Sequence, residues 1–218
     1  MEQLPESLPD NPLPLLNEWL KHAKAADVLP NPDAMTLATV SESGAVSARI
    51  ILCKMLVEEP GYLVFYTNYE SPKGIDIGSG SRVAGVFHWD KLDRQVRIEG
   101  IAVRSPDDES DAYFATRDKE SQIGAWTSVQ SQPLGSRQEL KDKHVATARK
   151  LADLQDESGK TEIPRPPFWG GYRIWIDKVE FWCRGEARLH DRGCWTRSLE
   201  ASDRGFKVDD WTCTRLQP

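Results

Sequence analysis

The spacing of apolar residues changes period several times along the chain. Between Pro12 and Asp27 apolar side chains recur at helical spacing, which predicts an amphipathic helix. From Met35 onward the apolar residues instead form short strand-like runs that are separated by polar turns. The strands predicted in this part are residues 35–40, 46–56, 62–67, 83–89 and 95–103, with a short helix starting after Ser71.

The middle of the chain favours helices, and the end returns to strands. The predicted helices are residues 106–117, 121–127 and 136–155; a proline-rich loop covers 163–171, and strands follow at 172–176, 179–189, 194–199 and 206–216. Because strands and helices do not alternate regularly, we expect a closed or partly closed antiparallel barrel with helices packed on it. Residues 1–11 are predicted to be a flexible leader, and residues 12–218 a single domain.

Composition and charge argue against several classes of protein. The chain has 28 Lys and Arg residues against 34 Asp and Glu residues, a net charge of −6, whereas nucleic-acid-binding domains are usually basic. Its apolar runs are too short to span a bilayer, and the N-terminus lacks the pattern of a signal peptide. We therefore expect a cytoplasmic protein that binds neither nucleic acid nor membrane.

Motifs of the commoner catalytic classes are missing from the sequence. It contains no glycine-rich phosphate loop, no His/Cys cluster with metal-ligand spacing and no G-x-S-x-G elbow. The four cysteines (Cys53, Cys183, Cys194 and Cys213) form no C-x-x-C pair and are expected to be buried thiols. Nucleotide hydrolysis, metal chemistry and serine hydrolysis therefore lose support.

The predicted strand 179–189 and the residues after it are polar at every second position. A period of two places the following residues on one face: Trp182, Arg184, Glu186, Arg188, His190 and Arg192. This row is either a solvated edge strand with a ladder of ion pairs or a cationic wall that holds an anionic planar ligand. In the second case His190 can donate a hydrogen bond or transfer a proton.

Two other sets of polar residues could bind an anion. Tyr113, Arg117 and Ser121 are spaced at i, i+4 and i+8, so they share one helix face if the helix continues that far, and together they can donate several hydrogen bonds to a phosphate. The alternative is an ordinary exposed helix face. Arg49 and Lys54 face opposite sides of a regular strand, so either a bulge brings them together or they serve two ligands or two subunits.

Six short segments occur in a fixed order along almost the whole chain, from about Asn11 to Pro218. They are RIILCK (49–54), FYTN (65–68), RQV (94–96), SQIGAW (121–126), FWGG (168–171) and the run from EFW to RLHDR (180–192). Together they resemble the pyridoxine (pyridoxamine) 5′-phosphate oxidase family. The resemblance implies an FMN-binding split β-barrel, mainly antiparallel, with a helical block packed on it. It also implies a homodimer with FMN at the subunit interface.

The resemblance further implies which residues form the site. The implied FMN contacts are Arg49, Ile50, Ile51, Leu52, Cys53, Lys54, Tyr66, Thr67, Lys73, Gln95, Gln130, Ser131, Trp182 and Arg192. The implied substrate contacts are Lys54, Tyr113, Arg117 and Ser121 on the substrate phosphate, with Arg188 and His190 as catalytic residues over its ring. Pro72 is a departure, because the family usually has an arginine there that contacts the FMN phosphate, and we therefore expect weaker FMN retention.

The implied activity is oxidation of pyridoxine or pyridoxamine 5′-phosphate to pyridoxal 5′-phosphate, in the biosynthesis or salvage of vitamin B6. A hydride passes from the substrate C4′ to flavin N5, and O2 then takes the electrons to give H2O2. One alternative is a related split-barrel flavin oxidase that acts on another aromatic substrate, as in phenazine biosynthesis. Another is a protein that binds FMN or a B6 phosphate without turnover.

Overall fold

The computed structural model describes residues 3–78, 80–152, 162–203 and 205–218. The helices are α1 (Leu13–Ala25), α2 (Pro72–Ile77), α3 (Asp107–Ala115), α4 (Lys119–Thr127) and α5 (Arg137–Ala152). The strands are β1 (Ala34–Val40), β2 (Val46–Leu52), β3 (Met55–Val57), β4 (Tyr62–Asn68), β5 (Ser81–Trp89), β6 (Arg94–Arg104), β7 (Trp169–Cys183), β8 (Asp191–Thr196), β9 (Leu199–Ser202), β10 (Gly205–Val208) and β11 (Thr212–Leu216). No helix of this described part is long and apolar enough to cross a membrane.

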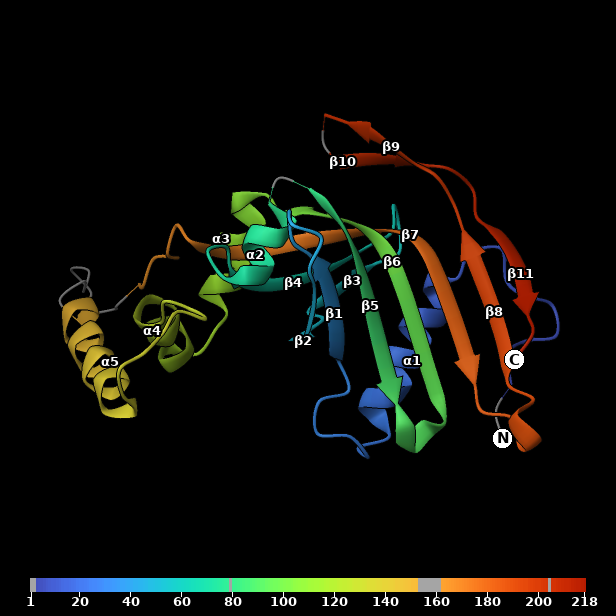
Figure 1. The fold of residues 1–218 in the computed structure, drawn as a ribbon, viewed down its shortest axis with the longest axis horizontal. Coiled ribbons are helices and arrows are strands. Elements are labelled where there is room, and N and C mark those ends of the chain that lie inside the picture. The colour runs from blue at the N-terminus through green and yellow to red at the C-terminus, as the bar shows by residue number, and fades with distance from the viewer. Residues whose placement is uncertain (1–2, 79, 153–161, 204) are drawn as a thin grey trace.

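Nine of the described strands form one large antiparallel sheet that curls into an open half-barrel, and β9 and β10 pair separately with each other (Figure 1). Its order is β11-β8-β7-β6-β5-β1-β2, and β4 joins it by pairing with β7. The long strand β7 pairs with β6 along nearly its whole length, but along its other edge it changes partner. Residues 169–175 pair with β4, and residues 178–183 pair with β8. The predicted split-barrel class is therefore confirmed, and the helices α4 and α5 lie beyond one end of the sheet (Figure 1).

The core lies between the concave sheet and α1, whose apolar face the sequence predicts. On β6 the buried residues Val96 and Ile98 alternate with Arg97 and Glu99, so that this strand has one apolar and one polar face. Trp19 of α1 is 4% exposed and meets the ring of Phe181 edge-to-face at 4.8 Å. Burial of one such large side chain contributes about 1.5–3 kcal/mol.

The strand predicted at 179–189 ends at Cys183, so the predicted six-residue strand face is wrong. Beyond it the chain turns back, because Ala187 and Arg188 have left-handed backbones with φ of 50° and 66°. Gly185 is required in this turn, since a Cβ on it would lie 1.8 Å from the carbonyl oxygen of Leu189. The turn joins β7 to β8 as a hairpin.

The shared helix face considered for Tyr113, Arg117 and Ser121 would need one continuous helix, and the structure has two. Helix α3 ends at Ala115 and α4 begins at Lys119, so Arg117 lies in the link between two helices. Asp118 caps α4, because its carboxylate accepts a hydrogen bond of 2.8 Å from the Ser121 backbone N–H. The cap favours a fresh helix start over the continuation of α3.

Both termini pack against the last strands of the sheet. Leu4 is buried, and the Trp195 indole donates a 2.7 Å hydrogen bond to the Pro9 carbonyl oxygen. The flexibility expected of residues 1–11 stays a prediction. Cys53, Cys183 and Cys194 are buried as expected, whereas the prediction is wrong for Cys213, which lies exposed on β11. The end of the helix predicted at 136–155 lies outside the described residues.

A glycine at the bulge between β6 and β7 gives a stability test. The pairing register shifts between Glu99 and Gly100, and a Cβ on Gly100 would lie 2.1 Å from the Trp175 carbonyl oxygen. Gly100→Ala should lower the free energy of unfolding by about 2 kcal/mol or more, measured by urea denaturation. Gly124→Ala on α4 is the control, because no atom lies within 4 Å of the added Cβ. An equal loss in both variants would contradict this packing.

Candidate functional site

A cavity of about 550 Å³ opens beside β4, between the end of β2 and the helices α3 and α4. Many of the predicted site residues line it: Ile50, Ile51, Leu52, Lys54, Tyr66, Thr67, Lys73, Tyr113, Arg117, Ser121 and Gln130. The break between β2 and β3 places Lys54 at its edge, where its ammonium group pairs with Asp33 at 3.4 Å. The structure therefore gathers residues that are up to 119 positions apart in the sequence, from Ile50 to Trp169, around one space.

One wall of this cavity is a stack of flat aromatic rings. The rings of Tyr66 and Tyr113 lie 3.8 Å apart and 6° from parallel, and Trp169 lies 5.6 Å from Tyr66. Burial raises the pKa of the Tyr66 phenol, helped by the nearby charge of Glu109, so Tyr66 stays protonated at neutral pH. Trp169 belongs to the FWGG segment but is not among the predicted contacts. The wall suits a planar aromatic ligand.

Arg117 places a poorly solvated cation at this wall. Its guanidinium carbon lies 4.7 Å from the centre of the Trp169 ring. One terminal nitrogen, Nη1, is buried and has no hydrogen-bond partner within the described part of the chain. Burial lowers the pKa of Arg117, which indicates that the charged form lacks full solvation. A bound anion would supply the missing acceptor.

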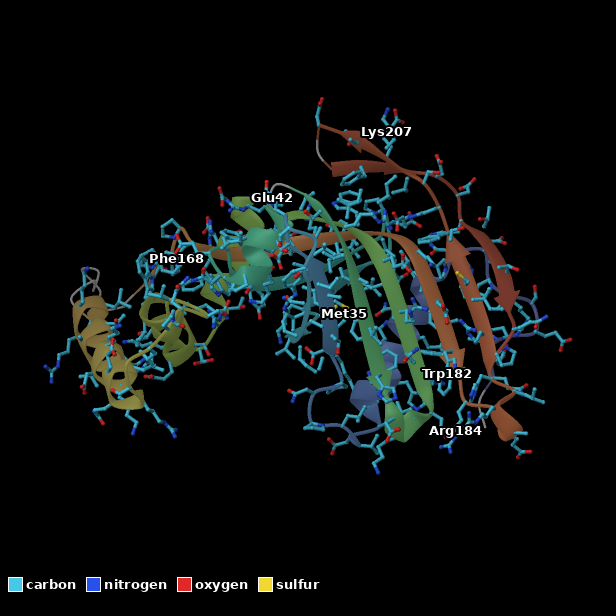
Figure 2. All side chains as sticks on the ribbon, in the orientation of Figure 1. Met35, Glu42, Phe168, Trp182, Arg184 and Lys207 are labelled. Carbon is cyan, nitrogen blue, oxygen red and sulfur yellow. The ribbon has the colours of Figure 1, made fainter. Side chains whose placement is uncertain are left out.

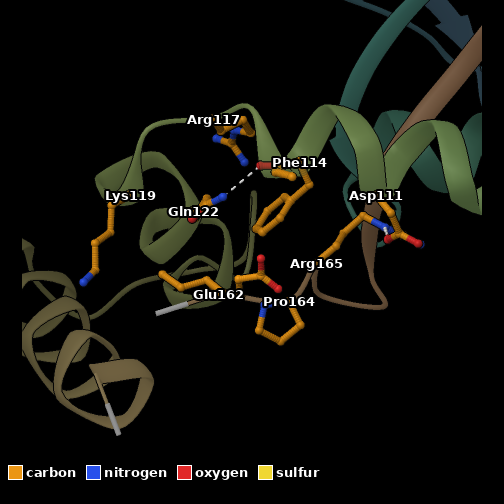
Figure 3. Close-up of a pocket in the computed structure, with 10 residues that line it drawn as sticks. Asp111, Phe114, Arg117, Lys119, Gln122, Glu162, Pro164 and Arg165 are labelled. Atoms are coloured by element: carbon orange, nitrogen blue, oxygen red, sulfur yellow. Dashed lines mark hydrogen bonds and ion pairs between the residues drawn. The ribbon is translucent and has the colours of Figure 1, made fainter. Parts of the chain in front are cut away.

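Arg117 also borders a second cavity, of about 840 Å³, between α3, α4 and residues 162–165 (Figure 3). There the Gln122 side-chain amide donates a 2.9 Å hydrogen bond to the Phe114 carbonyl oxygen. Arg165 donates to the carboxylates of Asp107 and Asp111 at 2.8 and 2.6 Å. These bonds hold α3 against the loop that precedes β7, and so fix the position of the helix that leads to Arg117.

A cationic corner lies at the other side of the first cavity, at the start of α2. The Lys73 ammonium group donates hydrogen bonds of 3.0 Å to Ser71 Oγ and to Gln130 Oε1. Thr67 Oγ1 donates to the same Gln130 oxygen at 3.0 Å. Burial, and after it the charge of Arg49, lowers the pKa of Lys73 to about 8. Two cations that repel each other beside a cavity favour binding of an anion.

The close approach of α2 to the preceding strand depends on Gly74. A Cβ on Gly74 would lie 2.3 Å from the Tyr69 carbonyl oxygen. Any other residue would push α2, and with it Lys73, away from β4.

Two further predicted FMN contacts, Cys53 and Ser131, are not among the residues that line the cavity. Cys53 is packed in the core, where burial raises the pKa of its thiol to about 12, so it is no nucleophile. Ser131, next to Gln130, has a left-handed backbone with φ of 68°.

The remaining predicted residues gather at the β7–β8 hairpin. Gln95, Trp182 and Arg192 are direct neighbours across β6, β7 and β8, so their side chains share one face. The Arg192 guanidinium donates to Glu180 Oε1 at 2.8 and 3.1 Å and to the Gln217 carbonyl oxygen at 2.7 Å. The hairpin thus brings together Trp182 and Arg192, although the straight strand predicted for them is wrong.

The turn of this hairpin places the exposed Arg188 and the half-buried His190 around a cavity of about 680 Å³. The His190 ring lies 4.6 Å from that of Trp182, and its Nδ1 accepts a 3.2 Å hydrogen bond from the Gly185 backbone N–H. In the neutral ring Nε2 therefore carries the proton. The left-handed backbone of Arg188 is a rarely populated conformation for a residue with a side chain, and such residues occur often at functional sites.

The two groups of residues lie at opposite ends of β7. Figure 2 shows Phe168, just before β7, on the side of α4, and Trp182 at the far end of the strand. The thirteen steps from Trp169 to Trp182 span up to roughly 40 Å in an extended strand. One chain therefore presents two separate groups of candidate site residues. No group of three or more His, Cys, Asp or Glu side chains that could hold a metal ion occurs among the described residues.

Two family models match most of the chain. Residues 22–149 match the model described as pyridoxamine 5′-phosphate oxidase. Residues 169–218 match the pyridoxine 5′-phosphate oxidase C-terminal dimerisation region. The second match includes both β7 and the hairpin.

Curated relatives of similar length carry the same family name. The pyridoxine/pyridoxamine 5′-phosphate oxidase of Burkholderia ambifaria is 46% identical over 208 residues, which are 95% of this chain and 89% of the relative. The protein of the same name from Rubrobacter xylanophilus is 45% identical and covers 95% of this chain and 87% of its own length.

Solved structures share the fold. PhzG from Burkholderia lata 383, in complex with tetrahydrophenazine-1-carboxylic acid, superposes with a TM-score of 0.80 at 29% identity, covering 96% of this chain and 94% of PhzG. A pyridoxamine 5′-phosphate oxidase-related, FMN-binding protein from Nostoc punctiforme gives a TM-score of 0.69 at 15% identity, covering 97% and 100% of the two chains. From these matches, the chain belongs to the pyridoxamine 5′-phosphate oxidase family of oxidoreductases.

Proposed function

We propose that the chain is an FMN-dependent oxidase that converts pyridoxine or pyridoxamine 5′-phosphate to pyridoxal 5′-phosphate, with O2 as acceptor and H2O2 as product. One observation carries the proposal. The first cavity has an aromatic wall and two separate cationic places, one at Lys73, which lies near Arg49, and one at Arg117. A phosphorylated flavin together with a phosphorylated aromatic substrate needs two such places.

The residues around the cavity fit FMN. Lys73, Arg49 and the Thr67 and Gln130 side chains would hold its phosphate, because the two cations repel each other until an anion lies between them. Bound FMN supplies the redox chemistry by accepting two electrons. The weaker retention expected from Pro72 stays a prediction; Pro72 is the first residue of α2, directly before Lys73.

The substrate phosphate would lie at Arg117, where a buried nitrogen lacks an acceptor among the described residues. Lys54, Tyr113 and Ser121 line the same cavity and add donors. Binding at a phosphate remote from the reacting carbon fixes the position of the ring and so contributes to catalysis. Arg188 and His190 would lie over the ring, with the Nε2 proton of His190 available as a donor.

The site would be completed by a second copy of the chain. Arg188 and His190 lie at the opposite end of β7 from Arg117, so they would reach the ligand in the cavity of the partner subunit. The edge strand β2 and its neighbour expose the apolar side chains of Val40, Val46, Ile50 and Leu52, which a partner would cover. The match to a dimerisation region supports this homodimer.

A phenazine-type oxidase is the second candidate, because PhzG shares the fold at a TM-score of 0.80. The ligand named for PhzG, tetrahydrophenazine-1-carboxylic acid, carries no phosphate. If such a ligand were bound beside FMN, one of the two cationic places would have no phosphate to bind. Relatives named for oxidation of B6 phosphates at up to 46% identity also favour the first proposal.

Flavin reduction without O2 tests the function directly. The protein loaded with FMN should lose its flavin absorbance when pyridoxine 5′-phosphate is added, and pyridoxine without the phosphate should react far more slowly. Arg188→Ala should slow the reduction by about a hundredfold or more while leaving FMN binding nearly unchanged. Arg82→Ala, which changes an exposed arginine on β5, is the control. Unchanged flavin colour with the phosphorylated substrates would refute the oxidase.

FMN binding should weaken as the pH rises above 8. Lys73, whose pKa is lowered to about 8, carries its charge below that pH and loses it above, whereas the FMN phosphate is a dianion from about pH 6 upward. We expect the affinity, measured by quenching of flavin fluorescence, to fall several-fold from pH 7 to 9.5. Lys73→Arg should flatten the profile, since arginine stays charged. A profile that is identical in both proteins would show that Lys73 does not hold the phosphate.

A further inference from the structure

We propose that Thr39 and Asp76 are positioning residues, which hold the Arg49 guanidinium in place for the phosphate of the flavin. The inference rests on the proposed FMN site. It concerns two residues outside the cavity lining, one on β1 and one on α2. Neither touches the place where the phosphate would lie, so both would act through Arg49.

The three side chains form a continuous chain of hydrogen bonds. Thr39 is 1% exposed, and its hydroxyl donates to Asp76 Oδ2 at 2.6 Å. The same hydroxyl oxygen accepts a 2.7 Å hydrogen bond from Arg49 Nη1. Arg49 Nη1 also lies 3.3 Å from the Leu37 carbonyl oxygen, and Nη2 donates to Ser47 Oγ. The guanidinium is thus held along the β1–β2 ladder, where Arg49 pairs with Leu37.

The direction of these bonds follows from their chemistry. A threonine hydroxyl has one proton, and an ionised carboxylate can only accept, so the proton points to Asp76. The lone pairs of the hydroxyl then face Arg49, which can only donate. The 2.6 Å distance is typical of a hydrogen bond to a charged acceptor. Asp76 therefore fixes the orientation of Thr39, and Thr39 fixes that of Arg49.

The negative charge of Asp76 allows an electrostatic role of this residue to be distinguished from a positioning role. Burial lowers the pKa of the Arg49 guanidinium, and the charge of the nearby Asp76 partly opposes that shift. A carboxylate near an anion-binding corner repels the anion, so simple electrostatics would predict that removal of Asp76 tightens FMN binding. Positioning predicts the opposite, because without Asp76 the Thr39 hydroxyl is free to rotate and Arg49 loses its fixed acceptor.

Affinities for FMN and for riboflavin, which lacks the phosphate, separate positioning from general damage. Thr39→Val keeps the shape but removes both hydrogen bonds, and should weaken FMN binding about tenfold while leaving riboflavin binding unchanged. Thr39→Ser, which keeps the hydroxyl, should bind FMN to within about threefold of the unmodified protein. An equal loss for both flavins in Thr39→Val would overturn the proposal.

Asp76→Ala tests whether loss of the carboxylate weakens or tightens FMN binding. Asp76 lies on the half-buried face of α2, so the substitution carries little risk to folding. The FMN affinity of this variant should fall several-fold, with riboflavin again unaffected; tighter FMN binding would overturn the positioning role. The unmodified protein is measured first. If it binds FMN no better than riboflavin, the proposed FMN site itself fails, an outcome distinct from failure of the Thr39 and Asp76 variants.

Discussion

The pairing of β7 with three other strands is the constraint on which the rest of the structure depends. Its first half holds β4, its second half holds β8, and β6 follows nearly the whole length of its other edge. This exchange of partners opens the sheet into a half-barrel with two distinct ends. Trp169 at one end lines the cavity, and Trp182 at the other end lies beside His190. The separation of the two groups of candidate site residues is thus a consequence of strand pairing.

Desolvated positive charge gives the cavity its chemical character. Lys73 is half-buried near Arg49, and Arg117 keeps a buried nitrogen without an acceptor in the described part of the chain. Burial of such groups costs free energy that the protein alone does not recover. A phosphate bound at each place would offset that cost, and would explain how a chain with a net charge of −6 could bind two anions. Net charge describes the surface as a whole, whereas binding depends on these few side chains.

Much of the fold could be predicted from the sequence, because apolar periodicity reports which face of an element is buried. Helix α1 and strands β1, β4, β5 and β6 follow the predicted ranges closely. The hairpin turn could not be predicted from periodicity, since Ala187 and Arg188 adopt left-handed backbones without a glycine at either position. A break between helices at 106–117 and 121–127 was predicted, but their bounds were not, because the cap by Asp118 lets α4 begin at Lys119 and α3 already ends at Ala115.

The residues of the candidate site could be predicted, but their arrangement in space could not. The resemblance to a family named the residues of the first cavity, yet spacing alone could not show that residues near β2, α2 and α4 surround one space. The hydrogen bond from Thr39 to Asp76 joins residues 37 positions apart, and no motif marks either of them. Such contacts depend on how α2 packs against β1, which a sequence pattern does not report.

The central claim, that each site combines residues of two chains, is tested most directly with mixed dimers. Arg117→Ala and Arg188→Ala damage different half-sites, so a dimer of one chain of each kind retains one complete site. Co-expression of the two chains with different affinity tags should restore turnover to about half that of the unmodified dimer, because one of two sites is intact. A mixture of Arg117→Ala with Lys54→Ala, in which both sites stay damaged, should remain inactive. Failure of the first mixture to regain activity would contradict the account.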